Sequence, residues 1–436
     1  MIELLQIFLQ LFIFTFLTSF PINKYTLEIC NVKNKFNFFH FLSINSLILL
    51  LLLLLFSFIK IDLIKIFFII IFFHLTILII IRKNISFSKL NILEVFFFFL
   101  SLSIFINTTN NLELGWDGFA WKQKANFFYN GGFFFDIYKF ENVYSNYPHL
   151  GTYLWAFFWK NTLLNYEYSG RLFYSYIYLL SLFTIASSFY YIKNFHKIVI
   201  VFLIFFFTYD KTLDGYQVYI IFYILNIFFI FLIYNHYDQK NKIFYLVFCL
   251  SGVLLPWVKL EGMIYVILII IIFCYYEFSL KKNKLSFIYF LNIFLIFFSL
   301  LSKILIFKFL LNEKTTFQFN LEFSVFIAPL SEYISKTYYI IFYSVVSFFK
   351  YPIWLLNILG LLICYKNYKK NDILKIFILC FFLNVIFIFF TFFMSPSDIK
   401  WHLATALDRL YLQTSGIYFT MFVIIFNNKI YPVKFS

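Results

Sequence analysis

The sequence predicts an all-helical protein that crosses a membrane many times. Hydrophobic residues make up 63% of the chain, charged residues make up 13%, and the mean hydropathy is +0.87. A typical soluble domain has about 25% charged residues, so this chain carries roughly half the usual share. Apolar runs recur along its whole length, and runs of about 18 or more residues are typical of membrane-spanning helices. These observations favour a polytopic membrane domain over a soluble fold.

The apolar runs predict roughly thirteen spans. Two of them, 197–209 and 243–257, are short for a membrane crossing. The expected spans lie near residues 4–20, 42–60, 63–81, 92–107, 168–192, 197–209, 215–236, 243–257, 259–277, 285–307, 351–366, 372–394 and 410–427.

The basic residues indicate the orientation of these spans. Lys and Arg gather in short loops, which is typical of the cytoplasmic side of a membrane protein. This pattern accounts for the net charge of +15 without nucleic acid as a partner. If successive loops are to alternate between the two sides of the membrane, the stretch 150–164 must not cross it. We therefore expect a helix lying at the membrane interface there, and another over 336–349. Four polar segments then share the non-cytoplasmic face: residues 108–150, 209–215, 308–335 and 395–409.

The polar segment 108–150 holds the candidate catalytic residue, Asp117. Asp117 follows a span closely, and partial burial near the membrane boundary raises the pKa of a carboxylate and prepares it to act as a general base. Trp121 and Lys124 follow at helical spacing, so they share a face with Asp117 if this part is helical. An aromatic ring and a cation beside a base suit an amphiphilic, negatively charged substrate. The alternative is an interfacial helix with an anchoring Trp and snorkelling Lys.

The end of this segment and the next span supply further candidates. Tyr147 and His149 flank Pro148 and are predicted to position a sugar or an acceptor. Arg171 begins the following span and is a candidate phosphate contact; the alternative is that it neutralises Glu167.

Two later segments carry ionisable groups between apolar runs. Lys259 and Glu261 lie in an otherwise apolar hairpin, where charged groups are costly and by default functional. The alternative is a mutual ion pair at a tight turn. Lys400, His402 and Arg409 stand between two long spans and are predicted to bind phosphate oxygens. Here the alternative is an interfacial helix whose cations meet lipid phosphates.

Several motifs are missing from the sequence. The five cysteines form no CxxC pair, and there is no HExxH, GxxxxGK[ST] or GxSxG pattern. The sequence therefore predicts no metal site, no ATP hydrolysis and no elbow serine. A divalent cation remains an open alternative as cofactor.

The order of these motifs resembles the GT-C superfamily of membrane glycosyltransferases, which use polyprenyl-phosphate sugars. The resemblance rests on Asp117 after a span, the Tyr147-Pro148 turn and the Arg171-Leu172 pair. The stretches GWDGFAWKQKA, YPHLGTYLW, VKLEG and KWHLATALDRL also look like a bacterial branch of that superfamily. The likeness covers about residues 92–427. It implies a catalytic unit over 92–436 and extra N-terminal spans over 1–91.

The resemblance also implies roles for particular residues. Asp117 would deprotonate the acceptor, while Lys259, His402 and Arg409 would hold the lipid phosphate leaving group. Family members often carry a second acidic residue, for which Asp214 is the candidate, although Gln217 and Val218 stand where Asp is expected.

The implied partners are membrane lipids, a polyprenyl-phosphate sugar as co-substrate and a glycan, lipid or protein acceptor. The implied location is a bacterial plasma membrane with the site on its periplasmic or extracellular side.

Other functions remain open at this point. A transporter or flippase of lipid-linked sugars predicts charges in the middle of spans, and the sequence has few, since Lys303 lies inside an apolar run near its end and most others lie at the ends of runs. A surface-polysaccharide polymerase or ligase also uses large non-cytoplasmic loops with Arg and His. A purely structural membrane partner would leave the collected polar loops unexplained.

Overall fold

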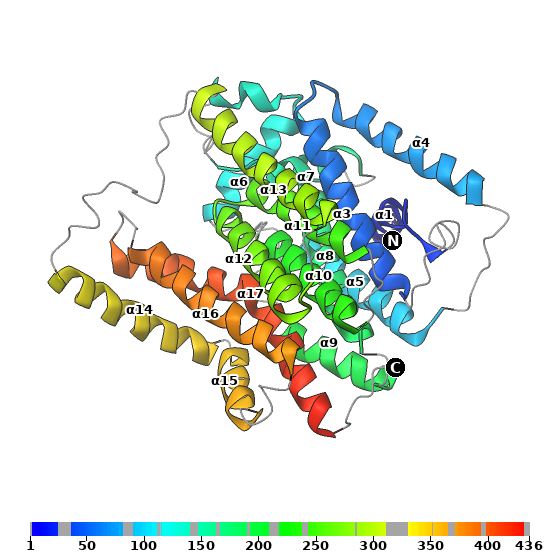
Figure 1. Ribbon diagram of the computed structural model, residues 1–436. Coiled ribbons are helices and arrows are strands. Elements are labelled where there is room, and N and C mark those ends of the chain that lie inside the picture. Colours follow the sequence, from blue (N-terminus) through cyan, green and yellow to red (C-terminus); the bar gives the residue numbers. More distant parts are fainter. Residues whose placement is uncertain are drawn as a thin grey trace.

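The computed structural model describes residues 2–24, 36–81, 90–110, 114, 116–139, 147–162, 166–189, 192–208, 218–237, 243–283, 286–310, 330–350, 352–364, 371–393 and 398–430, and within these ranges it is helical without a strand (Figure 1). The elements are α1 (Ile2–Thr18), α3 (Phe38–Ser57), α4 (Leu63–Ile81), α5 (Ile92–Asn110), α6 (Trp116–Tyr129), η2 (Phe134–Lys139), α7 (Leu150–Lys160), α8 (Tyr168–Ser187), α9 (Asn194–Thr208), α10 (Val218–Tyr237), α11 (Ile243–Val258), α12 (Gly262–Cys274), η4 (Tyr275–Leu280), α13 (Phe287–Leu305), η5 (Ile306–Leu310), α14 (Leu330–Lys350), α15 (Ile353–Cys364), α16 (Asp372–Phe393) and α17 (Ile399–Ile430).

The predicted all-helical, multi-pass character is confirmed, but the count of roughly thirteen spans is not. Six described helical stretches are long and apolar enough to cross a membrane, or seven if the bent pair α14–α15 is one span. They are α3, α4, α10, α12 with η4, α13 and α16. Four further apolar helices, α1, α5, α9 and α11, have only 10–17 residues in their apolar part. Several predicted spans are therefore present as helices that are too short by themselves to count as membrane crossings.

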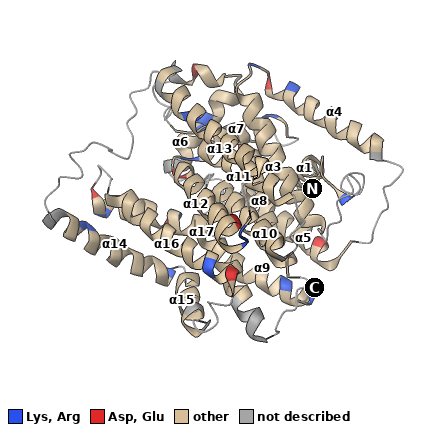
Figure 2. Cartoon of the chain, in the orientation of Figure 1, with Lys and Arg blue, Asp and Glu red and all other residues tan. Residues whose placement is uncertain are grey.

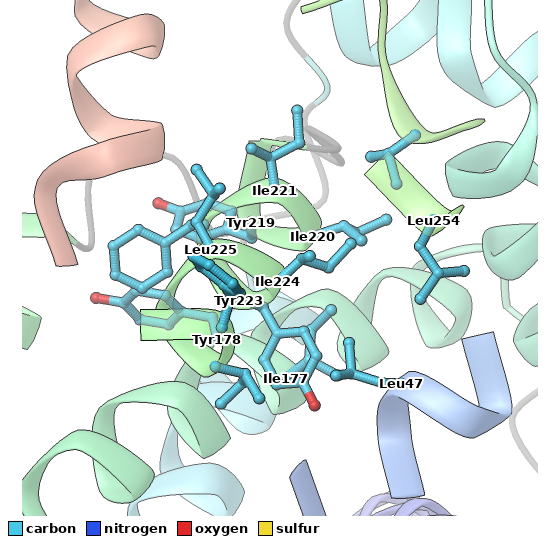
Figure 3. Close-up of a cluster of buried hydrophobic side chains, with 14 of the residues drawn as sticks. Leu47, Ile177, Tyr178, Tyr219, Ile220, Ile221, Tyr223, Ile224, Leu225 and Leu254 are labelled. Atoms are coloured by element: carbon cyan, nitrogen blue, oxygen red, sulfur yellow. The ribbon is translucent and has the colours of Figure 1, made fainter. Parts of the chain in front are cut away.

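The centre of the bundle is built on α8 and α10. Every residue of α8 is buried, as is α10 from Val218 to Leu232. Tyr223 and Ile224 of α10 lie among Ile177 of α8 and Leu254 of α11 (Figure 3). A helix that is apolar on all sides is stable when protein or lipid surrounds it, and α8 and α10 are surrounded by protein. At the periphery, α4 and α14 lie along opposite sides of the bundle and expose many apolar side chains (Figure 1).

Helix α7 differs from the interfacial helix expected over 150–164. It is 11 residues long, which is too short to cross, but its residues from Leu150 to Phe158 are all buried. It packs against α6, α8 and α3. Helix α7 is therefore packed inside the bundle over most of its length.

Helices α11, α12 and α13 connect two ends of the bundle. At one end, which we call the site end, α11 finishes at Val258 and α12 starts at Gly262. A Cβ atom on Gly262 would lie 1.9 Å from the carbonyl oxygen of Leu255, so only glycine permits this tight turn. At the other end, which we call the opposite end, α10 finishes, α11 starts and η4 follows α12.

Candidate functional site

His149 lies at the middle of the site end. Its ring is fully buried, and its Nε2 atom is 2.7 Å from the hydroxyl oxygen of Ser57, the last residue of α3. The ring centroid lies 4.1 Å from that of Phe134 in η2 and 5.7 Å from that of Trp257 in α11. His149 therefore joins the polar segment to two distant helices.

Two buried polar atoms in this region, one of them in His149 itself, have no hydrogen-bond partner within the described part of the chain. They are Nδ1 of His149 and Nζ of Lys303 in α13, whose side chain is only 3% exposed. Burial lowers the pKa of His149 well below its ordinary value, and the charges of Lys124 and Lys303 lower it further. Leaving buried polar groups unsatisfied is costly, and in native proteins such groups call for an explanation such as a ligand or water.

Lys303 is the functional candidate that the sequence analysis did not assign to the site. It lies near the end of an apolar helix, and an ionisable residue in a membrane span is by default a functional candidate. A lysine inside an apolar run is visible in the sequence, but by itself it bears only on the transporter alternative and does not indicate this site.

Lys259 and Glu261 form the ion pair that was the alternative for this hairpin. Nζ of Lys259 lies 3.6 Å from Oε1 of Glu261, and both side chains are largely buried. Burial alone would raise the pKa of Glu261, but the charges of Lys259 and Arg409 lower it below its ordinary value. The carboxylate is therefore ionised at neutral pH, and Arg409 of α17 lies within electrostatic reach of it.

His402 brings the start of α17 to the same place. Its ring is buried against that of Phe392, with 5.0 Å between centroids. Burial lowers the pKa of His402, as does the charge of Arg409, while Glu261 opposes this effect. The imidazole is therefore neutral at neutral pH, and it shares its surroundings with Arg409 and Glu261.

These pairwise interactions link side chains from α6, α7, the α11–α12 turn, α13 and α17. We call this group the cationic cluster, and its members are Lys124, His149, Lys259, Glu261, Lys303, His402 and Arg409. Its basic residues outnumber Glu261, its one carboxylate among the described side chains. A buried excess of positive charge suits an anionic ligand.

Helix α6 is tied to the Tyr147-Pro148 turn. Lys124 is fully buried, and its Nζ donates a hydrogen bond to the carbonyl oxygen of Tyr147 at 2.6 Å. The ring of Trp121 meets that of Tyr147 edge-on, with 5.4 Å between centroids. Asp117 lies in the first turn of α6, two turns before Lys124 on the same helical face, but its side chain lies outside the described part.

Arg171 and Lys400 were predicted to bind phosphate, but the structure gives them other partners. Nε and Nη2 of Arg171 donate to the two carboxylate oxygens of Glu167 at 3.0 and 3.4 Å, as in the alternative considered for this residue. Lys400 is exposed, and its Nζ lies 4.7 Å from the centre of the Tyr339 ring of α14. Each cation is thus in contact with a neighbour from its own helix or from α14, and the assignment of both residues to phosphate binding stays a prediction.

Asp214 lies outside the described residues, as does most of the segment 209–219. Within the described ranges, no three His, Cys, Asp or Glu side chains gather closely enough to hold a metal ion. The second carboxylate and the divalent cation therefore stay predictions.

The fold defines a class, the multi-pass helical membrane proteins. Most of the described ribbon carries no charged residue (Figure 2), and the cationic cluster is one of the few places where such residues gather. No protein-family model, curated protein or solved structure matches the chain.

Proposed function

We propose that the protein is a membrane glycosyltransferase that moves a sugar from a polyprenyl-phosphate or polyprenyl-diphosphate carrier to an acceptor. The cationic cluster is the observation that carries this proposal. Segments as distant as α6 and α17 contribute to it, and the Nζ atom of Lys303 is buried there without a partner among the described residues. A lipid phosphate is the anionic group that a membrane helix bundle meets most directly.

The reaction needs no external energy source, because the donor carries its own leaving group. The acceptor oxygen forms a bond to the anomeric carbon while the bond between that carbon and the phosphate oxygen breaks. The acceptor proton passes to Asp117 as general base, and the electron pair leaves with the lipid phosphate. Lys259, Lys303 and Arg409 stabilise the charge that develops on the phosphate. Attack from the face opposite the phosphate inverts the anomeric centre.

The orientation of the site follows from the charge pattern of the sequence. The basic loops predicted to be cytoplasmic include 240–242 and 281–284, which flank helices at the opposite end. The site end would then face the periplasm or the cell exterior of a bacterial plasma membrane. The polyprenyl tail would lie against the apolar side chains that α12 and α13 expose, such as Ile267, Ile271 and Phe294.

The proposal is tested by incubating the purified protein with radiolabelled polyprenyl-phosphate sugars and following release of the lipid phosphate. We expect Asp117→Asn to abolish release while the protein stays folded and membrane-inserted. Asp136→Asn is a matched control, since it removes a carboxylate from the same polar segment outside the cationic cluster. Normal turnover by Asp117→Asn would show that the assigned mechanism is wrong.

A transporter or flippase of lipid-linked sugars is the second candidate. Among the described residues, buried polar side chains without partners also lie away from the site end, in Asn226 of α10 and Gln413 of α17. Such groups favour a polar path through the bundle. Movement of labelled lipid-linked sugar across vesicles without cleavage of the sugar–phosphate bond would select this function. A polymerase or ligase would share the leaving group and would be recognised by the length of its product.

A further inference from the structure

A pocket opens at the site end, between the α3–α4 turn and the turn from α6 to η2. Its volume is about 210 Å³, below the roughly 300–1,000 Å³ that is typical of sites for larger ligands. The N-terminal spans form one wall, and the polar segment and α7 form the other. The pocket is therefore of a size that suits a single monosaccharide unit.

One side of the pocket is polar. Lys60 and Asp62 line it with exposed side chains from the α3–α4 turn. Oδ1 of Asp62 accepts a hydrogen bond from the backbone N–H of Ile64 at 2.8 Å, which fixes the carboxylate at the start of α4. Tyr153 and Asp62 both line the pocket, and the charge of Asp62 adds to the burial that raises the pKa of the Tyr153 hydroxyl. The wall thus offers one cation, one anion and one hydroxyl.

The rest of the lining includes three aromatic side chains and a glycine with open space beside it. The rings of Phe128 and Tyr153 meet edge-to-face at 5.2 Å, and Phe133 lies beside them. Gly131 has a φ angle of +85°, and a Cβ atom placed on it would meet nothing within 4 Å. Phe128 and Tyr153 are themselves buried, so the partly exposed side chain of Phe133 and the backbone of Gly131 form the accessible apolar surface next to the polar groups.

The pocket adjoins the cationic cluster. Ser57 lines the pocket, and its hydroxyl is the group that lies 2.7 Å from Nε2 of His149. Phe128 also touches both regions, since its ring centroid lies 6.1 Å from that of His149. A group held in the pocket would be one side chain away from an anion held by the cluster.

We propose that this pocket binds one neutral hexose unit of the acceptor. A pyranose has an apolar C–H face that packs on aromatic rings, and its hydroxyl groups need both donors and acceptors. Lys60 and Asp62 balance in charge, so the pocket favours a neutral ligand, in contrast with the cluster beside it. The role as acceptor site rests on the proposed function, whereas the sugar binding itself does not. The N-terminal spans, which the likeness to glycosyltransferases left without a role, would then supply half of the acceptor site.

The test is saturation-transfer NMR of the purified full-length protein with the methyl glycosides of glucose, galactose and mannose. We expect at least one of them to receive saturation from the protein. Asp62→Asn should weaken that binding roughly tenfold, because a hydrogen bond to a charged group is lost. Asn also caps helices well, so the start of α4 is preserved. Gly131→Asn should reduce binding as well, since Asn tolerates positive φ and its side chain fills the open space.

Asp398→Asn is the matched control. Asp398 also accepts a backbone hydrogen bond at a helix start, from Trp401 at 2.9 Å, but it does not line the pocket. Absence of binding for all three glycosides, or equal binding by the wild type, Asp62→Asn and Gly131→Asn, would overturn the proposal. Glycoside binding that depends on Asp62, without any release of lipid phosphate, would support the pocket and reject the transferase function. Release of lipid phosphate without Asp62-dependent binding of a glycoside would support the transferase function and reject the pocket as a sugar site.

Discussion

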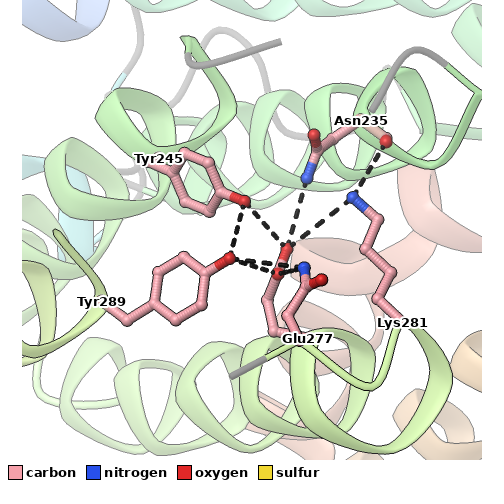
Figure 4. A network of polar contacts seen from close by, with 6 residues as sticks. Asn235, Tyr245, Glu277, Lys281 and Tyr289 are labelled. Atoms are coloured by element: carbon pink, nitrogen blue, oxygen red, sulfur yellow. Dashed lines mark hydrogen bonds and ion pairs between the residues drawn. The ribbon is translucent and has the colours of Figure 1, made fainter. Parts of the chain in front are cut away.

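The two ends of the bundle both bury charged side chains, but they satisfy them very differently. At the opposite end, Glu277 is fully buried, and Tyr289 and Asn283 donate hydrogen bonds to it at 2.9 and 2.7 Å (Figure 4). Tyr245 and Asn235 add longer contacts at 3.4 Å. At the site end, Lys303 and one nitrogen of His149 have no hydrogen-bond partner among the described residues.

The comparison separates a structural role from a binding role. The same helices, α11 to α13, contribute to both ends, so the membrane environment and the helix packing are shared. Glu277 and Lys281 lie 3.9 Å apart at the opposite end, within a network of amides and hydroxyls that holds α10, α11 and α13 together. Oδ1 of Asn235 and the hydroxyl of Tyr276 at the opposite end also lack partners among the described residues, so the contrast concerns Glu277, which is satisfied, and Lys303, which is not. A satisfied buried charge stabilises one arrangement, whereas an unsatisfied one costs stability.

The largest effect is expected from Glu277→Ala. The substitution leaves an empty space at the fully buried position of Glu277 and takes the partner from Lys281, Asn283 and Tyr289, and removing one partner of a buried ion pair costs about 3–5 kcal/mol. The thermal unfolding midpoint, measured in a fixed detergent, should therefore fall sharply. Turnover per folded molecule should remain. An unchanged midpoint would mean that the network contributes little to stability.

Lys303→Met should act in the opposite direction. Met has a similar length and no charge, so it removes a buried, unsatisfied ammonium, and we expect a gain of about 1–2 kcal/mol in the free energy of unfolding. Release of lipid phosphate should be lost in the same variant. A stability loss comparable to that of Glu277→Ala would contradict the contrast between the two ends.

Because of His149, the contribution of the site end to the free energy of unfolding should depend on pH. The pKa of His149 is lowered in the folded state, so below its ordinary value of 6.5 the unfolded chain binds more protons than the folded one. The contribution to stability is therefore complete above pH 6.5 and is lost as the pH falls, by up to about 1.4 kcal/mol per pH unit. His149→Gln should lose less stability than the wild type between pH 6.5 and 5.5. Parallel unfolding curves for the two proteins would count against this assignment.

The smallest effect is expected from Lys375→Ala at the opposite end. Lys375 pairs with Asp372 at 2.7 Å on the partly exposed first turn of α16. Such helical pairs contribute about 0.3–0.5 kcal/mol, so the unfolding midpoint should barely move. High salt should weaken what effect remains. A large shift would show that exposed charges matter as much as the buried network of Glu277.

Part of the candidate site was predictable from the sequence. Lys259, Glu261, His402 and Arg409 stood out because charged groups interrupt apolar runs, and the structure brings these residues together. The pairing of Arg171 with Glu167 was also within reach, since residues four apart on a helix are neighbours.

Other features depend on contacts between distant segments. The contact between Ser57 and His149 spans 92 positions, and neither residue signals it locally. The placement of Lys400 against Tyr339 likewise depends on where α14 packs. No spacing rule within one helix could have predicted either contact.

The sequence by itself determined the environment of this protein. Its apolar runs can be stable only as helices, because backbone groups in a lipid environment must be hydrogen-bonded within the chain. Tertiary structure decided which of the rare charges meet and which are satisfied. That outcome depends on side-chain packing between helices such as α11, α13 and α17, where rotating one helix about its axis by half a turn would exchange a buried neighbour for lipid. The division between a stabilising end and a binding end is therefore a property of the packed bundle.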